Sequence, residues 1–225
     1  MTPAQSDLPG LSGLSKHRLE ALTDGIFAVA MTLLVIELKF PETLHIQTQE
    51  QLLDALVHLI PKFIAWVISF VVLAIFWVSH HRLFHFVRHV DVRLQWLTIF
   101  YLACVSLMPF SSSLSGEYGG ALVSQIFYSV NMMLLGMMAL LKSRYVFRHP
   151  ALCAPPMPLS VFKGARIRTS GLITVAMLAI VVTWALPGMG SIGNIAFMLM
   201  IVFGKIGRRV EMREAQSQQA AIQSV

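Results

Sequence analysis

Two groups of ionisable residues have side-chain types and spacings that could support ligand binding or catalysis. Each group lies in or beside a long apolar stretch. Asp24 lies inside the first apolar stretch, about two helical turns after Arg18. Four histidines follow the second stretch, and the last three have i, i+4 and i+8 spacing, as on one helical face: His80, His81, His85 and His89. Histidines at such spacing can bind zinc or haem.

A structural role for these histidines is the better interpretation. They alternate with Arg82 and Arg88 at the end of an apolar stretch, where basic side chains commonly bind helix ends and lipid headgroups. No carboxylate or cysteine completes a first coordination shell. We therefore predict no metal site and no cofactor, and a histidine-bearing haem or metal membrane protein stays open as an alternative.

A run of hydroxyls lies between Pro109 and Gly116: Ser111, Ser112, Ser113 and Ser115. A serine nucleophile needs a neighbouring base, and no histidine lies close to this run in the sequence; the outer loop that holds His45 is a different one. We interpret the run as a turn. Because the sequence also lacks a carboxylate pair or metal motif at a membrane interface, we predict that the chain is not an enzyme.

The composition places these residues in a membrane protein. The chain has 225 residues, of which 56% are hydrophobic and 12% charged, against about 25% charged in soluble domains. Its mean hydropathy is +0.70. Soluble enzymes and DNA-binding proteins are therefore excluded, and no nucleic-acid partner is expected. The net charge of +6 instead reflects basic cytoplasmic loops.

Apolar stretches long enough to approach the roughly 20 residues of a membrane-spanning helix recur along the chain. Six spans are predicted: Leu19–Leu38, Pro61–Ser79, Leu94–Pro109, Ala121–Leu141, Gly171–Leu186 and Ile192–Ile206. The expected fold is all-α, a polytopic membrane protein with the lipid bilayer as its surroundings. Ionisable groups are absent near the middle of the last five spans, which weakens a proton-coupled transporter.

The distribution of positive charge predicts the orientation of the spans. Of the 17 Lys and Arg residues, only Lys39 and Lys62 fall on one side. Cytoplasmic loops retain positive charge, so both termini are expected in the cytoplasm, and the Lys142 to Arg168 connection is interpreted as a basic cytoplasmic loop. We expect a flexible segment over residues 1–15, a transmembrane unit over residues 16–207 and a cytoplasmic tail over residues 208–225.

The first span has two faces of different character. At about 100° per residue, Gly25, Val29, Thr32, Leu33 and Ile36 form one stripe about 100° wide. Asp24 falls on the opposite side, which predicts that it points into the protein's own helix packing. The stripe itself could simply contact lipid or another helix.

Three sequence segments together resemble the transmembrane protein 175 potassium channels. Residues 18–25, Arg-Leu-Glu-Ala-Leu-Thr-Asp-Gly, are similar to the Arg-x-x-x-Phe-Ser-Asp signature that opens the family's first helix. Residues 76–81 and 108–111 resemble segments after the second and third helices. Leu22 and Thr23 replace the usual Phe and Ser, and Thr98 stands where many members have Asn, so the network joining the helix ends can differ.

The resemblance implies a function and assigns roles to residues. In the family the first helix lines a pore whose constriction is apolar, and the matching positions are Val29, Leu33 and Ile36, with Thr32 adjacent. The family also has a network at the cytoplasmic side that holds this helix. The resemblance assigns this network to five residues of the present sequence: Arg18, Thr23, Asp24, His80 and His81. The chain is thus expected to be a leak-type, potassium-permeable channel and, with one six-helix unit, a homotetramer in a bacterial plasma membrane. A proton-leak or cation-carrier pathway through the same helix stays open.

Overall fold

The computed structural model describes residues 15–40, 47–185, 204–210 and 212–213. Apart from an isolated bridge between Val87 and Cys153, the regular structure of these residues is helical. The elements in chain order are α1 (Lys16–Ile36), α2 (Gln49–His58), α3 (Ile60–Phe86), α4 (Val92–Ser106), α5 (Met108–Glu117), α6 (Leu122–Arg148), the short 3-10 helix η1 (Pro150–Leu152) and α7 (Leu159–Ala185). The all-α prediction is confirmed.

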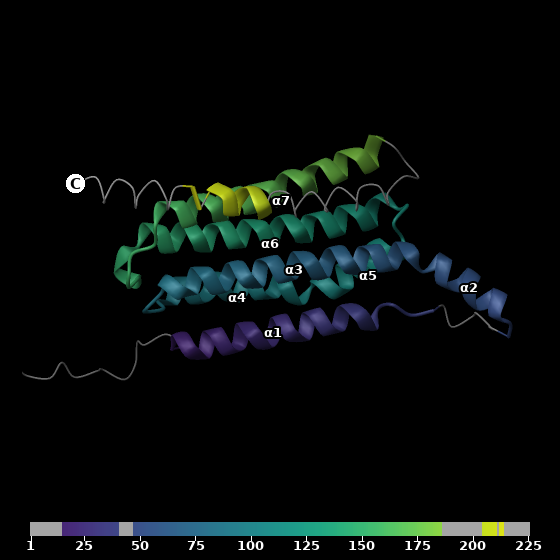
Figure 1. Ribbon diagram of the computed structural model, residues 1–225, viewed down its shortest axis with the longest axis horizontal. Helices are drawn as coiled ribbons and strands as arrows, with labels where there is room; N and C mark the ends of the chain where they lie inside the picture. Colours follow the sequence, from purple (N-terminus) through teal and green to yellow (C-terminus); the bar gives the residue numbers. More distant parts are fainter. Residues whose placement is uncertain (1–14, 41–46, 186–203, 211, 214–225) are drawn as a thin grey trace, which may run out of the picture.

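The long helices form an elongated bundle with α1 and α7 on opposite faces (Figure 1). α1 packs on α3, α4 and α5, whereas α7 packs on α6. One apolar core runs through the bundle and includes Phe27, Phe76, Tyr101, Met132 and Leu172. The short helix α2 projects from the end of the bundle at which α3 begins (Figure 1).

Five helical segments within the described residues are long and apolar enough to cross a membrane. They correspond to the first five predicted spans, and the sixth, Ile192–Ile206, lies mostly outside the described residues. The third segment, Val92–Glu117, combines α4 and α5. Leu107 between them keeps a helical conformation, and Pro109, which has no N–H to donate, explains why the hydrogen-bonded helix is interrupted there.

The prediction of a long basic loop from Lys142 to Arg168 is wrong. α6 continues to Arg148 and α7 already begins at Leu159, so the connection covers only residues 149–158. Lys142 and Arg168 are buried, at 2% and 6% exposure. The charged residues extend the helices beyond their apolar stretches, because Lys and Arg are good helix formers whose charge does not end a helix.

The serine run is not a turn either, because it lies in α5. Its side chains join helices. Asn131 of α6 donates to Ser111 at 3.0 Å, and Ser115 donates to Gln125 of α6 at 3.2 Å. Small hydroxyl side chains allow helices to approach closely and supply hydrogen bonds where the surroundings are apolar. The sequence signal of a turn, a proline before and a glycine after the run, marked the two ends of a helix instead.

A chain of buried hydroxyls connects α3, α5 and α6. Ser69 donates to Ser112 at 2.8 Å, and Ser112 donates to the carbonyl oxygen of Ala65 at 3.3 Å. The Tyr128 hydroxyl lies 3.0 Å from the Ser69 oxygen. Because the Ser69 proton points to Ser112, Tyr128 must be the donor in this pair.

We predict that Tyr128→Phe lowers the thermal midpoint of the purified protein in detergent. The change removes one buried hydrogen bond, worth about 0.5–1.5 kcal/mol, and keeps the ring in place. Tyr118→Phe is the matched control, since Tyr118 is 57% exposed. Equal midpoints for wild type and Tyr128→Phe in thermal unfolding would show that the hydroxyl chain does not stabilise the bundle.

Candidate functional site

α1 buries one face and leaves the other exposed among the described residues. Five residues of the helix are buried: Leu19, Thr23, Phe27, Ala30 and Leu34. On the other face Val29 is 56% exposed, Leu33 41% and Ile36 51%. Thr32 is exposed between them. The stripe expected from the sequence is therefore the face of α1 that the other described residues leave exposed, where lipid, water or another copy can lie against it.

The Thr32 hydroxyl is oriented by its own helix. Its oxygen lies 3.0 Å from the carbonyl oxygen of Ala28 and 2.9 Å from that of Val29, so the hydroxyl proton points at the backbone. The oxygen keeps a lone pair directed away from the helix. An oxygen with that orientation can accept a hydrogen bond from water or face a cation.

A shallow apolar groove of about 390 Å³ runs beside the uncovered face of α1. Leu22, Gly25, Val29 and Leu33 line it from α1, and Ser106 lines it from α4. Gly25 has no atoms near the position that a β-carbon would take. The groove therefore has room for a side chain or helix from outside the chain.

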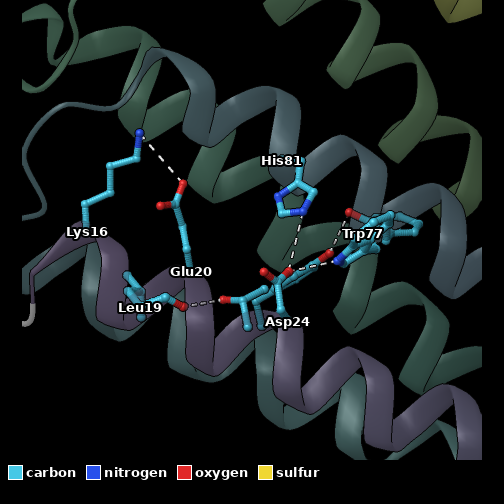
Figure 2. Close-up of polar contacts among 9 residues, drawn as sticks. Lys16, Leu19, Glu20, Asp24, Trp77 and His81 are labelled. Carbon is cyan, nitrogen blue, oxygen red and sulfur yellow. Dashed lines mark hydrogen bonds and ion pairs between the residues drawn. The ribbon is translucent and has the colours of Figure 1, made fainter.

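Asp24 lies at the flank of α1 and faces α3 (Figure 2). Its Oδ1 atom accepts a hydrogen bond from Trp77 Nε1 at 2.9 Å, and His81 Nε2 lies 3.5 Å from the same oxygen. The ion pair with His81 forms only when the imidazole is protonated. The sequence predicts that Asp24 points into the helix packing, and its partners do lie on α3. The side chain is nevertheless 47% exposed, so it is not fully buried.

The other two α1 residues of the expected network have different surroundings. Thr23 is buried, and its hydroxyl donates to the Leu19 carbonyl at 2.8 Å, so it satisfies its own helix. Arg18 is exposed, and within the described residues its guanidinium contacts no acid. The nearby ion pair at 3.7 Å joins Lys16 to Glu20 instead (Figure 2). The structure thus brings Asp24 and His81 together but leaves Arg18 apart from them.

His80 belongs to a second, buried cluster. Its Nδ1 atom lies 3.0 Å from Lys142 Nζ, and the Lys142 ammonium lies 3.4 Å from the centre of the Tyr101 ring. The Tyr101 hydroxyl donates to the Phe76 carbonyl at 3.2 Å. A cation above an aromatic face is attracted by the ring's negative face. This cluster joins α3, α4 and α6. The adjacent residues His80 and His81 therefore have different partners, Lys142 for His80 and Asp24 for His81.

The interpretation of His81, His85 and His89 as one helical face is wrong, because α3 ends at Phe86 and His89 lies outside it. Within the part of the chain that the structure describes, no group of three or more His, Cys, Asp or Glu side chains is placed to hold a metal ion. His80 and His81 are instead occupied by Lys142 and Asp24.

Sequence reasoning missed the main partners of these residues. The sequence assigned no contact to Trp77, and it placed Lys142 in a loop. The i, i+4 spacing of Trp77 and His81 on one helix was the available signal, since both side chains then face the same neighbour. Nothing in the sequence distinguished Lys142, because its pairing with His80 and Tyr101 depends on how three helices pack.

Comparisons with known proteins give the same assignment as the residues. The family described as endosomal/lysosomal potassium channel TMEM175 matches residues 18–109. A potassium channel of Streptomyces collinus is 38% identical over 101 residues, which cover 45% of this chain and 48% of the relative. A potassium channel of Chryseobacterium is 33% identical over 128 residues, covering 52% and 63%. The chain thus matches about half the length of such curated relatives.

More distant relatives carry a different name. The endosomal/lysosomal proton channel TMEM175 of Gallus gallus is 32% identical over 110 residues, which cover 47% of this chain and 22% of the relative. All of these proteins are named as channels, not as enzymes, and their names mention no cofactor.

The fold resembles a solved structure over most of the chain. A crystal structure of a lysosomal potassium-selective channel TMEM175 homologue from Chamaesiphon minutus superposes with a TM-score of 0.68 and 26% identity, covering 85% of this chain and 97% of the other. The resemblance drawn from the sequence is therefore confirmed: this multi-pass membrane protein is similar to the TMEM175 channels, in sequence through residues 18–109 and in fold over most of its length.

Proposed function

We propose that the chain is a potassium-permeable, leak-type cation channel that works as a homotetramer. The observation that carries the proposal is the uncovered apolar stripe of α1, with Val29 56% and Ile36 51% exposed, opposite a buried face that fixes the helix. One helix cannot surround a pore, so several copies must each contribute their α1 around a common axis. The names of the bacterial relatives support potassium as the permeant ion.

The membrane topology is part of this proposal. Six spans with both termini in the cytoplasm would place the basic ends of α3, α6 and α7 on the inner side, as the distribution of Lys and Arg favours. The N-terminus of α1 lies at that same end of the bundle (Figure 1). The bacterial relatives favour the plasma membrane as the location.

The pore would select ions by dehydration at Val29, Leu33 and Ile36. These side chains offer no oxygen to replace water around an ion, so a cation must shed part of its hydration shell to pass them. Potassium sheds water at a lower cost than sodium, which favours potassium. Thr32 lies on the same stripe, and its oxygen lone pair, directed away from the helix, can face the partly dehydrated ion.

The contacts behind α1 would hold this pore helix in position. Asp24 is bound to Trp77 and His81 of α3, while His80 is bound to Lys142 of α6. Thr23 reinforces α1 itself, and Arg18, which is exposed in the single chain, is available to a neighbouring subunit. In this proposal none of the five network residues touches the ion.

A proton pathway is the second candidate, because the vertebrate relatives are named proton channels. The uncovered face of α1 would serve a proton as well as a cation if water fills the space between the copies. The two candidates differ in what drives the flux, which is a potassium gradient in one and a pH gradient in the other.

We predict that liposomes containing the protein release potassium into a sodium medium, and that Leu33→Ala plus Ile36→Ala changes this flux at least several-fold by widening the constriction. Leu178→Ala plus Val181→Ala on α7 is the matched control, because Leu178 is 46% and Val181 55% exposed, and it should leave the flux unchanged.

Light scattering should give each of these variants the mass of four 25.0 kDa chains. If the wild type carries no flux under a potassium gradient and carries flux only under a pH gradient, the result would favour the proton pathway. Equal changes of potassium flux in the two double variants would show that α1 does not line the pore.

Val29 provides a separate test of the constriction. Val29→Asn should raise cation flux and reduce the preference for potassium over sodium, because a polar amide replaces apolar surface at the neck. Val29→Ile should lower the flux and sharpen the preference, because the added methylene narrows the neck. Bi-ionic reversal potentials in planar bilayers measure both effects. Unchanged permeability ratios in both variants would place Val29 outside the pore.

The anchoring of α1 predicts an energetic coupling between Asp24 and Trp77. Asp24→Ala and Trp77→Phe should each lower the free energy of unfolding, and the double variant should lose less than the sum, with a coupling of about 1 kcal/mol. Asp24→Asn, which keeps an oxygen acceptor for Trp77, should lose less than Asp24→Ala. Denaturant titrations in detergent measure these values. Additive effects would show that the 2.9 Å contact does not hold α1.

A further inference from the structure

A groove on the other side of the bundle from α1 combines an apolar wall with a cluster of positive charges. It has a volume of about 420 Å³ and lies between α3, the first half of α7 and the helical segment of residues 204–210. Figure 1 shows this last segment, in yellow, beside α7. The groove is separate from the α1 face on which the proposed channel function rests.

The apolar wall is one stripe of α3. Val71, Ala74, Ile75 and Val78 line the groove, and their i, i+3, i+4 and i+7 spacing puts them on a single face of the helix. Phe70 adds an aromatic ring at the far end. Phe70 and Val78 are each 38% exposed, so the wall is open to the surroundings of the bundle.

The charged end of the groove gathers cations from three segments. Arg82 continues the α3 stripe by one turn, Arg168 comes from α7, and Lys205 and Arg208 come from the helical segment. The residues that line the groove include no Asp or Glu among the part of the chain that is described. Four positive charges around one opening create a strong attraction for an anion.

Arg168 is built into this end of the groove. It is only 6% exposed, and its guanidinium donates to Ser79 of α3 at 3.4 Å. A β-carbon placed on Gly207 would lie 3.1 Å from the Arg168 side chain and 3.1 Å from the Gly164 carbonyl oxygen. The helical segment therefore sits directly on Arg168 and α7, which fixes Lys205 and Arg208 beside the two arginines.

The dimensions match one leaflet of a membrane. From Phe70 to Arg82 the helix rises about 18 Å at 1.5 Å per residue, and half of the hydrocarbon core measures about 15 Å. A molecule with one charged end and a long apolar part can thus place an acyl chain along α3 and its charge among the four cations. A free phosphate or a nucleotide would leave the apolar wall uncovered.

We propose that this groove binds an anionic phospholipid, with the phosphate and headgroup at Arg82, Arg168, Lys205 and Arg208 and an acyl chain along the α3 stripe. Basic pockets between membrane-spanning helices are suited to anionic headgroups, because the planar guanidinium groups bind phosphate oxygens in pairs. Zwitterionic lipids lack the net charge that the four cations require. The bound lipid would join α3, α7 and the helical segment.

The test uses the full chain in a neutral detergent and native mass spectrometry to count retained lipids. Dioctanoyl phosphatidylglycerol is the probe, and dioctanoyl phosphatidylcholine is the zwitterionic comparison. Wild type should retain the phosphatidylglycerol at least about tenfold better than the phosphatidylcholine. Equal retention of the two lipids would overturn the proposal.

Variants locate the binding. Arg82→Gln, Lys205→Gln and Arg208→Gln together should weaken retention of phosphatidylglycerol about tenfold, given the usual contribution of three accessible charges. Arg88→Gln, Arg93→Gln and Arg144→Gln remove the same charge from exposed positions at the same end of the bundle and should weaken it less than twofold. Equal losses in the two triple variants would mean general surface attraction and would overturn the site.

Two further arms separate the lipid from other occupants. Ala74→Trp fills the groove beside the α3 stripe and keeps every charge, so it should reduce phosphatidylglycerol retention as strongly as the triple variant of Arg82, Lys205 and Arg208. It also tests the site if that triple variant does not fold. Glycerol 3-phosphate should not displace the lipid at equal concentration. Full retention in Ala74→Trp, or displacement by glycerol 3-phosphate, would indicate a phosphate site without an acyl-chain groove and would refute the proposal.

Discussion

The structure depends on how α1 is held from one side only. One apolar face of α1 is exposed, so the helix is attached through the opposite face, where Phe27 and Leu34 enter the core. The contact of Asp24 with Trp77 and His81 adds a polar attachment at the flank. Because Trp77 and His81 both lie on α3, the contact opposes rotation of α1 about its own axis.

The rest of the bundle is joined by buried polar groups that contact one another across the helices. Ser69, Ser112 and Tyr128 form a directed chain of hydroxyls between three helices. Lys142 is placed against His80 and the Tyr101 ring. Because the packing surfaces are otherwise as apolar as lipid, shape and hydrogen bonding distinguish the correct packing from a rotated or shifted one. These contacts form the rigid support against which α1 presents its free stripe.

The two faces of the molecule have different chemistry for a common reason. Apolar side chains that the described helices leave exposed can meet lipid or another copy, and the charges around them decide which occupant fits. The α1 stripe has no charge beyond the flanking Asp24, which suits the contact between copies around a pore that we propose. The α3 stripe ends in Arg82 and lies beside Arg168, which suits a lipid with an anionic headgroup.

The sequence by itself determined the helical class, five of the membrane spans, the stripe on α1 and the resemblance to the channel family, because each rests on hydrophobic pattern or on a local motif. It did not determine where helices end when charged residues continue them, as at Lys142 and Arg168, nor that the serine run lies in a helix. Only the tertiary structure decided that Asp24 binds Trp77, that His80 and His81 have separate partners, and that four cations surround one groove. Those features depend on the rotation and spacing of helices far apart in sequence, which no periodicity along one segment contains.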